Sequence, residues 1–140
     1  MKANFILISI LIFVKTADPT PEQLEQIRAD ILKYHNEYRK IHQVDELTRD
    51  ADIEKIAQNY SEYLIKNNIF DHSHRKGYGE NLYGCTGSGI CATGKSVTDN
   101  WYNEIQFYDY NNPVFSGETG HFTQVVWKGS TKIGCGVACN

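Results

Sequence analysis

Four side chains have types that could do chemistry at a shared site: two histidines, His72 and His121, and two glutamates, Glu80 and Glu104. Imidazole nitrogens and carboxylate oxygens are good ligands for a divalent cation such as zinc, and the same groups can act as general acid and base. The four residues are far apart in the sequence, so their spacing alone does not bring them together. Each also has an ordinary structural interpretation, as a solvated loop histidine, a turn acceptor or an exposed helix carboxylate.

His121 is the most informative of these residues. The run from His121 to Trp127 is rich in β-branched and aromatic residues and predicts a strand. On that strand, His121 would share a face with Thr123, Val125 and Trp127. An inward-facing histidine needs a hydrogen-bonding partner, so His121 is expected to be either paired or a metal ligand.

Short sequence motifs give no support for a familiar type of catalysis. The sequence contains no GxSxG, no HExxH, no phosphate-binding glycine loop and no dinucleotide fingerprint. Ser73 and Ser116 raise the question of a hydroxyl nucleophile, which needs a base within hydrogen-bond reach and a third group that orients the base. The adjacency of Ser73 and His72 proves nothing, because neighbouring side chains of an extended chain point apart.

Three helices are predicted to position these residues. The first begins with a capping box at Thr20, and an apolar stripe at spacings of three and four continues to about Arg39. A second begins at residues 48–50 and stops at 67–68, and a shorter third begins between residues 93 and 96.

Strands are predicted at 81–83, 121–127 and 133–139. The last two are separated by residues 128–131, which is hairpin spacing, whereas residues 84–94 read as a loop on composition. The mixture predicts an α+β domain in which helices cover a small antiparallel sheet.

The first seventeen residues are typical of a secretory signal peptide. Lys2 is followed by an apolar run from Phe5 to Val14, broken only by Ser9. About ten apolar residues are too few to cross a hydrocarbon core that takes about twenty in a helix, so no transmembrane segment is predicted. We expect cleavage near Thr16 or Ala17, one extracellular domain over residues 18–140, and, as the alternative, a short uncleaved anchor.

Charge and cysteine content restrict the possible partners of the protein and the roles of its cysteines. The net charge is −3 and the basic residues are scattered, which argues against nucleic acid as a partner. The four cysteines are at positions 85, 91, 135 and 139. Behind a secretory leader they favour disulfides over zinc, and their spacings do not fit C-x2-C. Four cysteines allow three pairings.

Longer stretches of the sequence resemble the CAP superfamily of cysteine-rich secretory proteins, antigen 5 and pathogenesis-related proteins. Residues 120–127, GHFTQVVW, are similar to its principal signature. Three further pieces occur in the expected order: HNEYR at 35–39, His72-Ser73 followed by GENLY at 79–83, and WYNEI at 101–105. The agreement extends from about Ile31 to Ala138.

The resemblance implies an α-β-α sandwich with an antiparallel sheet and a cleft lined by two histidines and two acidic residues. Carried over residue by residue, these are His72, Glu80, Glu104 and His121, with the two histidines as the metal ligands. Implied ligands are a sterol or fatty acid, zinc or another divalent cation, and a protein or glycan partner. Because fold does not define function, we expect a binding module and keep a cleft hydrolase, a protease or esterase, as the alternative.

The sequence departs from the family in two places. The loop that begins at Cys85 carries two cysteines close together, and the sequence given stops at Cys139-Asn140, where family members continue into a last strand. A domain shortened at its C-terminus would be unstable, because the run from Ile133 to Cys139 would present an unpaired edge. Family pairing implies a Cys139–Cys85 disulfide and leaves Cys91 and Cys135 unassigned.

Overall fold

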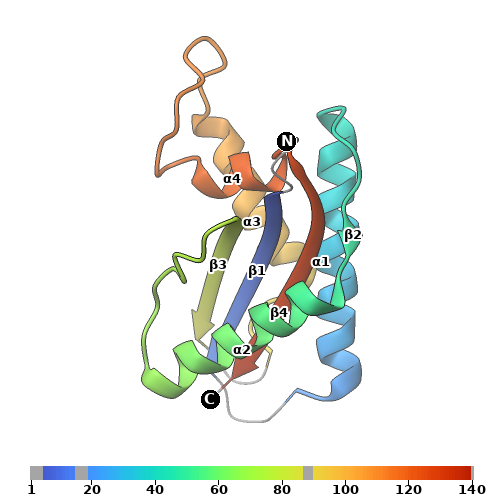
Figure 1. Cartoon of the computed structure of the whole chain (residues 1–140), viewed down its shortest axis with the longest axis vertical. Coiled ribbons are helices and arrows are strands. Elements are labelled where there is room, and N and C mark those ends of the chain that lie inside the picture. Colours follow the sequence, from blue (N-terminus) through green and yellow to red (C-terminus); the bar gives the residue numbers. More distant parts are fainter. Residues whose placement is uncertain (1–4, 15–18, 87–89, 140) are drawn as a thin grey trace.

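The computed structural model describes residues 5–14, 19–86 and 90–139, and for residues 5–14 it describes the backbone alone. The helices and strands alternate along the chain and form one layered unit (Figure 1). In chain order they are β1 (Phe5–Val14), α1 (Pro21–Ile41), β2 (Thr48–Arg49), α2 (Ala51–Asn67), β3 (Tyr78–Thr86), α3 (Gly94–Tyr102), the 3-10 helix η1 (Asn103–Phe107), α4 (Gly120–Val125) and β4 (Ser130–Cys139).

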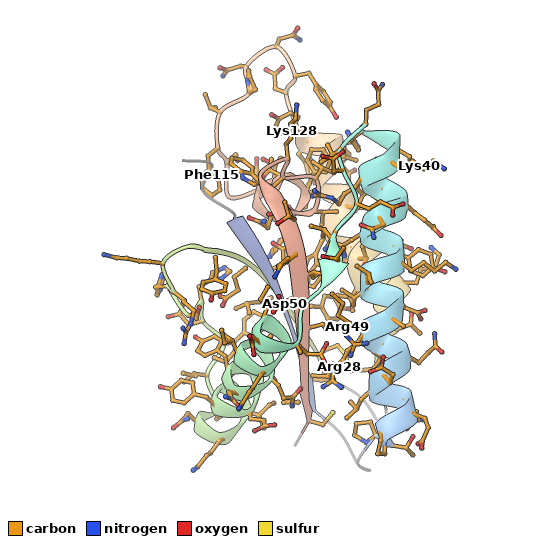
Figure 2. All side chains as sticks on the ribbon, turned by 45° about the vertical axis from the view of Figure 1, so that its right-hand side comes forward. Arg28, Lys40, Arg49, Asp50, Phe115 and Lys128 are labelled. Carbon is orange, nitrogen blue, oxygen red and sulfur yellow. A yellow bond between two sulfur atoms is a disulfide. The ribbon has the colours of Figure 1, made fainter. Side chains whose placement is uncertain are left out.

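The sheet lies between two helical layers. Figure 2 shows α1 on one side of β4 and α2 on the other. One core cluster joins Ile31 of α1 and Trp101 of α3 to the sheet, and a second joins Ala57 and Leu64 of α2 to Leu82 of β3. The predicted α+β class with helices on a small sheet is therefore confirmed.

The strand direction differs from the prediction. The strand order is β2-β4-β1-β3, and all three pairs are parallel, so the expected antiparallel sheet is wrong for the described strands. An antiparallel hairpin would have required residues 121–127 to form a strand, and most of them form α4. Parallel neighbours need long crossover connections, which the helices supply.

The predicted leader contains the central strand of this sheet. Phe5–Val14 pairs with β3 on one side and β4 on the other (Figure 1). On its other side, β4 pairs with β2 only at Lys132 and Ile133, so the expected edge without a strand partner is found among the described residues from Gly134 onward. The expected cleavage positions, Thr16 and Ala17, lie outside the described residues, and the leader itself stays a prediction.

Side chains continue the coverage of β4 beyond the short β2. Gln58 of α2 donates from Nε2 to the Val137 carbonyl at 2.9 Å and accepts from the Val137 N–H at 3.0 Å. Arg28 of α1 donates from Nε to the Cys135 carbonyl at 3.1 Å. These contacts satisfy backbone groups that an edge strand would otherwise present to another chain.

Two glycines of β4 let α2 lie directly on the sheet. A Cβ at Gly136 would be 2.3 Å from the backbone of Ala57, and one at Gly134 would be 2.2 Å from the Glu54 nitrogen. Between them, Cys135 belongs to the core cluster on the α1 side. The alternation of small and larger residues along β4 therefore sets the close packing of α2.

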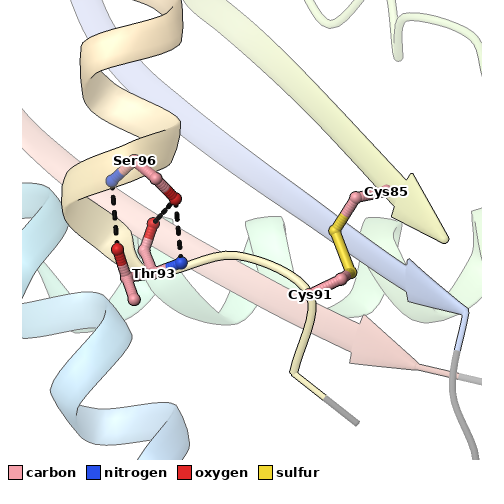
Figure 3. Close-up of a disulfide and its surroundings, with 4 residues drawn as sticks. All are labelled: Cys85, Cys91, Thr93 and Ser96. Carbon is pink, nitrogen blue, oxygen red and sulfur yellow. Dashed lines mark hydrogen bonds between the residues drawn. A yellow bond between two sulfur atoms is a disulfide. The ribbon is translucent and has the colours of Figure 1, made fainter. Parts of the chain in front are cut away.

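The predicted helix starts are confirmed. The Thr20 and Gln23 capping box begins α1, Asp50 caps α2, and Thr93 with Ser96 forms a second capping box at α3 (Figure 3). These starts were readable because a cap is a local contact between a side chain and backbone N–H groups three residues away.

The predicted strand at 121–127 is wrong, because residues 120–125 form α4. The Glu104 carboxylate accepts the N–H groups of His121 and Phe122 at 2.8 and 3.1 Å. At the other end, Arg39 donates to the Val125 carbonyl at 3.1 Å. These partners lie far away in the sequence and satisfy the backbone groups at the ends of the helix. β propensity depends on residue type alone, so it cannot include their contribution.

The disulfide also differs from the prediction. Cys85 is bonded to Cys91, with a Cα–Cα distance of 6.1 Å, so the expected Cys139–Cys85 pair is wrong (Figure 3). Cys85 and Cys139 both pair with Phe13, on opposite sides of β1. Two strand spacings of about 4.8 Å separate them by more than the roughly 7 Å that a disulfide spans. Cys135 is buried, and burial raises the pKa of its thiol to about 12.

A buried arginine joins three parts of the structure. Arg39 of α1 is fully buried and donates to four backbone carbonyls, at distances between 2.7 and 3.1 Å. The acceptors are Asp45, Val125, Trp127 and Ser130. The fork of N–H groups that only arginine presents holds α1, the end of α4 and the start of β4 together.

We predict that Arg39→Met lowers the free energy of unfolding by about 3 kcal/mol, because four backbone carbonyls, two of them in fully buried contacts, lose their charged donor. Chemical denaturation measures the change. Lys40→Met, an exposed neighbour on the same helix, is the control and should change stability little. Equal effects of the two substitutions would contradict this role of Arg39.

His35 of α1 is a second buried polar residue. Its Nδ1 lies 2.8 Å from the Ile31 carbonyl, so Nδ1 carries the proton and donates. Its Nε2 is buried and has no hydrogen-bond partner among the described residues. Burial, with a smaller contribution from the charge of Arg39, lowers the pKa of His35 to about 4.

The lowered pKa of His35 predicts that the folded protein loses stability in acid. An unfolded histidine titrates at about 6.5, so between pH 6.5 and 4 the unfolded chain binds a proton that the folded chain does not, and stability falls as the pH falls. His35 should contribute a loss of about 3 kcal/mol over this range. Denaturation of the wild type and His35→Gln at pH 7 and pH 4 measures the difference, and the exposed His74→Gln is the control. An unchanged pH dependence in His35→Gln would refute the prediction.

Candidate functional site

The first half of the site joins β3 to the segment that precedes it. His72 Nδ1 lies 2.7 Å from Glu80 Oε1, and the Ser73 N–H donates to the same oxygen at 2.9 Å. The Glu80 side chain is 8% exposed, whereas that of His72 is 49% exposed. A buried carboxylate thus orients an accessible imidazole.

The second half repeats this arrangement on other elements. His121 Nδ1 of α4 lies 2.6 Å from Glu104 Oε1 of η1. The other oxygen of Glu104 accepts the two backbone N–H groups that begin α4. One carboxylate therefore orients the imidazole and fixes the helix that carries it.

In both pairs Nδ1 of the imidazole faces the carboxylate, which leaves Nε2 for a further partner. A carboxylate that accepts from Nδ1–H fixes the tautomer in which Nε2 has a free lone pair. Carboxylate–histidine pairs of this kind orient metal-binding imidazoles and raise their basicity. The four residues singled out from the sequence thus form two pairs, His72 with Glu80 and His121 with Glu104.

Contacts between β3 and α4 link the two pairs. Asn81, next to Glu80, donates from Nδ2 to the His121 carbonyl at 3.1 Å. A Cβ at Gly79 would lie 2.0 Å from Gln124 Oε1, so the start of β3 is in direct contact with α4. Asn81 was not among the residues singled out from the sequence, although a polar residue beside Leu82 in a predicted strand is a signal for such a role.

The His121 ring is supported by a buried tryptophan. Trp101 of α3 lies 6.3 Å from His121 between ring centroids, with the planes 24° apart. Trp101 is itself fixed, because its Nε1 donates to the Leu82 carbonyl at 3.0 Å. The core thus positions one side of the site.

The serines considered as nucleophiles have other hydrogen bonds. Ser73 Oγ accepts the Arg75 N–H at 3.3 Å, and Ser116 Oγ accepts the Glu118 N–H at 3.2 Å. Both contacts close local turns. A catalytic serine would need a base in the same position, so these hydrogen bonds favour structural roles for the two hydroxyls.

An exposed apolar loop adjoins His121. Four residues, from the last residue of η1 to the loop before α4, leave from 61 to 84% of their surface in solvent: Phe107, Tyr110, Val114 and Phe115. The Phe115 ring lies 3.6 Å from where a Cβ of Gly120 would be, so the loop reaches the residue before His121. Exposed aromatic residues gathered in one loop mark a surface that contacts an apolar ligand or partner.

Two absences apply to the described part of the chain. No three side chains of His, Cys, Asp or Glu in it are grouped as they would be around a metal ion. None of its helices combines the length and the apolar character needed to cross a membrane.

Comparison with known proteins identifies the family. Residues 32–140 match the profile of the CAP family, described as the cysteine-rich secretory protein family. The match covers most of the chain, including all four site residues, and the chain belongs to this family. The resemblance inferred from the sequence is therefore confirmed.

Relatives come from animals, plants and fungi. Human Golgi-associated plant pathogenesis-related protein 1 is 40% identical over 81% of this chain and 74% of its own length. Pathogenesis-related protein 1A of Nicotiana tabacum is 38% identical over 98% of this chain and 81% of its own length. Secreted protein PRY1 of Candida albicans is 37% identical over 76% of this chain but only 24% of its own length.

Proposed function

We propose that this CAP-domain protein is a secreted binding module that holds a divalent cation such as zinc through His72 and His121. The observation that carries the proposal is the repeated pairing of an imidazole Nδ1 with a more buried carboxylate, at 2.7 and 2.6 Å. Both pairs then present Nε2 as the free ligand atom. Water would complete the coordination, which suits an exchangeable ion of modest affinity.

Calorimetric titration of zinc tests this proposal. The wild type should bind, and His121→Ala should not, because one of two nitrogen ligands is lost. Glu80→Gln should bind about ten- to a hundredfold more weakly, since the carboxylate only orients His72. His74→Ala is the matched control, an exposed histidine two residues from His72, and should bind as the wild type does.

The pH dependence separates a cation from an apolar ligand. Imidazole must be neutral to bind a metal, so zinc affinity should fall as the solution is made more acidic. Equal heats for the wild type and His121→Ala would end the proposal. In that case the two pairs are structural hydrogen bonds, and the substitutions should lower the melting temperature instead.

A sterol or fatty acid is the second candidate ligand, favoured by the exposed loop with Phe107, Tyr110, Val114 and Phe115 beside the site. Apolar contacts supply its affinity, so its binding should not change over the pH range that weakens zinc. A cleft hydrolase remains the alternative class. Turnover of peptides or esters by the wild type but not by His121→Ala would favour it.

We infer secretion from the leader, and a relative whose name describes it as secreted supports this inference. Expressed in a eukaryotic host, the protein should appear in the medium without about its first sixteen residues. Mass spectrometry of the secreted chain measures the new N-terminus. Retention in the cytosol with Met1 present would contradict the prediction.

Processing would have a structural consequence. β1 pairs with β3 on one side and with β4 on the other. When β1 is removed, both strands lose this partner. The processed chain should therefore unfold at a lower denaturant concentration than a chain that retains Phe5–Val14, unless another strand fills the position.

A further inference from the structure

The helix α2 carries an acceptor motif for N-linked glycosylation. Asn59-Tyr60-Ser61 is the single stretch of the sequence in which an asparagine is followed two positions later by serine or threonine. In a chain that enters the secretory route, this pattern marks an asparagine to which an oligosaccharide can be attached. Whether Asn59 can carry one depends on where α2 places its side chain.

Asn59 lies on the side of α2 that faces solvent. The buried residues of this helix are Ile53, Ala57, Ser61 and Leu64. At about 100° per residue, Asn59 is about 200° from both Ala57 and Ser61 around the helix axis, and it is exposed. Its side-chain amide makes no hydrogen bond to any residue that the structure describes. A bulky polar group on this nitrogen would therefore meet solvent and leave the packing of α2 on the sheet unchanged.

Ser61 restricts the time at which the motif can be recognised. Its side chain is fully buried in the fold, and its Oγ donates to the Gln58 carbonyl at 2.8 Å. An enzyme that requires the serine hydroxyl cannot reach it there. The modification must therefore occur before α2 packs against the rest of the domain.

The order of synthesis provides such an interval. The backbone of α2 lies directly on β4, where a Cβ at Gly134 would be 2.2 Å and one at Gly136 2.3 Å from it. The first residue of β4, Ser130, follows Asn59 by about seventy residues, which at roughly 5–20 residues per second is several seconds of synthesis. A helix in a protein owes most of its stability to the packing of its apolar face. We therefore expect the motif to stay accessible until β4 has been made.

We propose that Asn59 carries an N-linked oligosaccharide, attached during synthesis before α2 packs against β4. This inference rests on the secretion proposed above, because the donor, a lipid-linked oligosaccharide diphosphate, and the transferase belong to the secretory route. The Asn59 amide nitrogen forms a bond to C1 of the first sugar and loses one proton. The bond from C1 to the diphosphate oxygen breaks, and the lipid diphosphate leaves with the electron pair of that bond.

Intact-mass spectrometry of the protein from the medium of a eukaryotic host tests this inference. The wild-type mass should exceed that of the polypeptide, and peptide N-glycosidase should remove the excess and leave an aspartate at position 59. Asn59→Gln and Ser61→Ala should each lack the added mass. Because Ser61 is buried, the exposed Asn59→Gln decides the result if Ser61→Ala does not fold. Asn100→Gln removes an exposed asparagine outside the motif and is the matched control, which should carry the added mass as the wild type does.

The outcomes distinguish failure of the modification from failure of secretion. A wild-type chain in the medium that has lost its leader and has the mass of the polypeptide alone would overturn this inference and leave secretion intact. An unmodified chain retained in the cytosol would overturn both. Persistence of the added mass in Asn59→Gln would also overturn the inference, because the oligosaccharide would then be attached elsewhere.

Discussion

The Arg39 guanidinium is the contact on which the arrangement depends. It is buried, and four backbone carbonyls from three segments accept its N–H groups. One of them, at Val125, lies at the end of α4. A cation at a helix C-terminus interacts favourably with the exposed carbonyls and the helix dipole. The side chain therefore ties α1 to the helix that carries His121 and to the start of β4.

The short helix α4 shows how the site is assembled from distant parts. Six residues form too short a helix to be stable by themselves. Glu104 accepts its first N–H groups, and Arg39 donates to its last carbonyls. Glu104 also holds the His121 ring at 2.6 Å, so one carboxylate both caps α4 and orients the imidazole.

Glu80 and Glu104 play matching parts in the two halves of the site. One oxygen of Glu80 accepts from His72 and from the Ser73 N–H, and the other is buried without a hydrogen-bond partner among the described residues. The exposed loop near Phe115 reaches Gly120, the residue before His121. The His121 half of the site therefore adjoins an apolar surface.

What the sequence determined by itself was local. The caps at Thr20, Asp50 and Thr93 were predictable because each bonds N–H groups two or three residues away. The four site residues were selected by chemical type and joined only through the family resemblance. The tertiary structure alone decided that 120–125 is a helix, that the strands run parallel and that Cys85 meets Cys91. The first two outcomes depend on distant partners, on Arg39 and Glu104 for α4 and on β1 for the sheet, and no local pattern contains them.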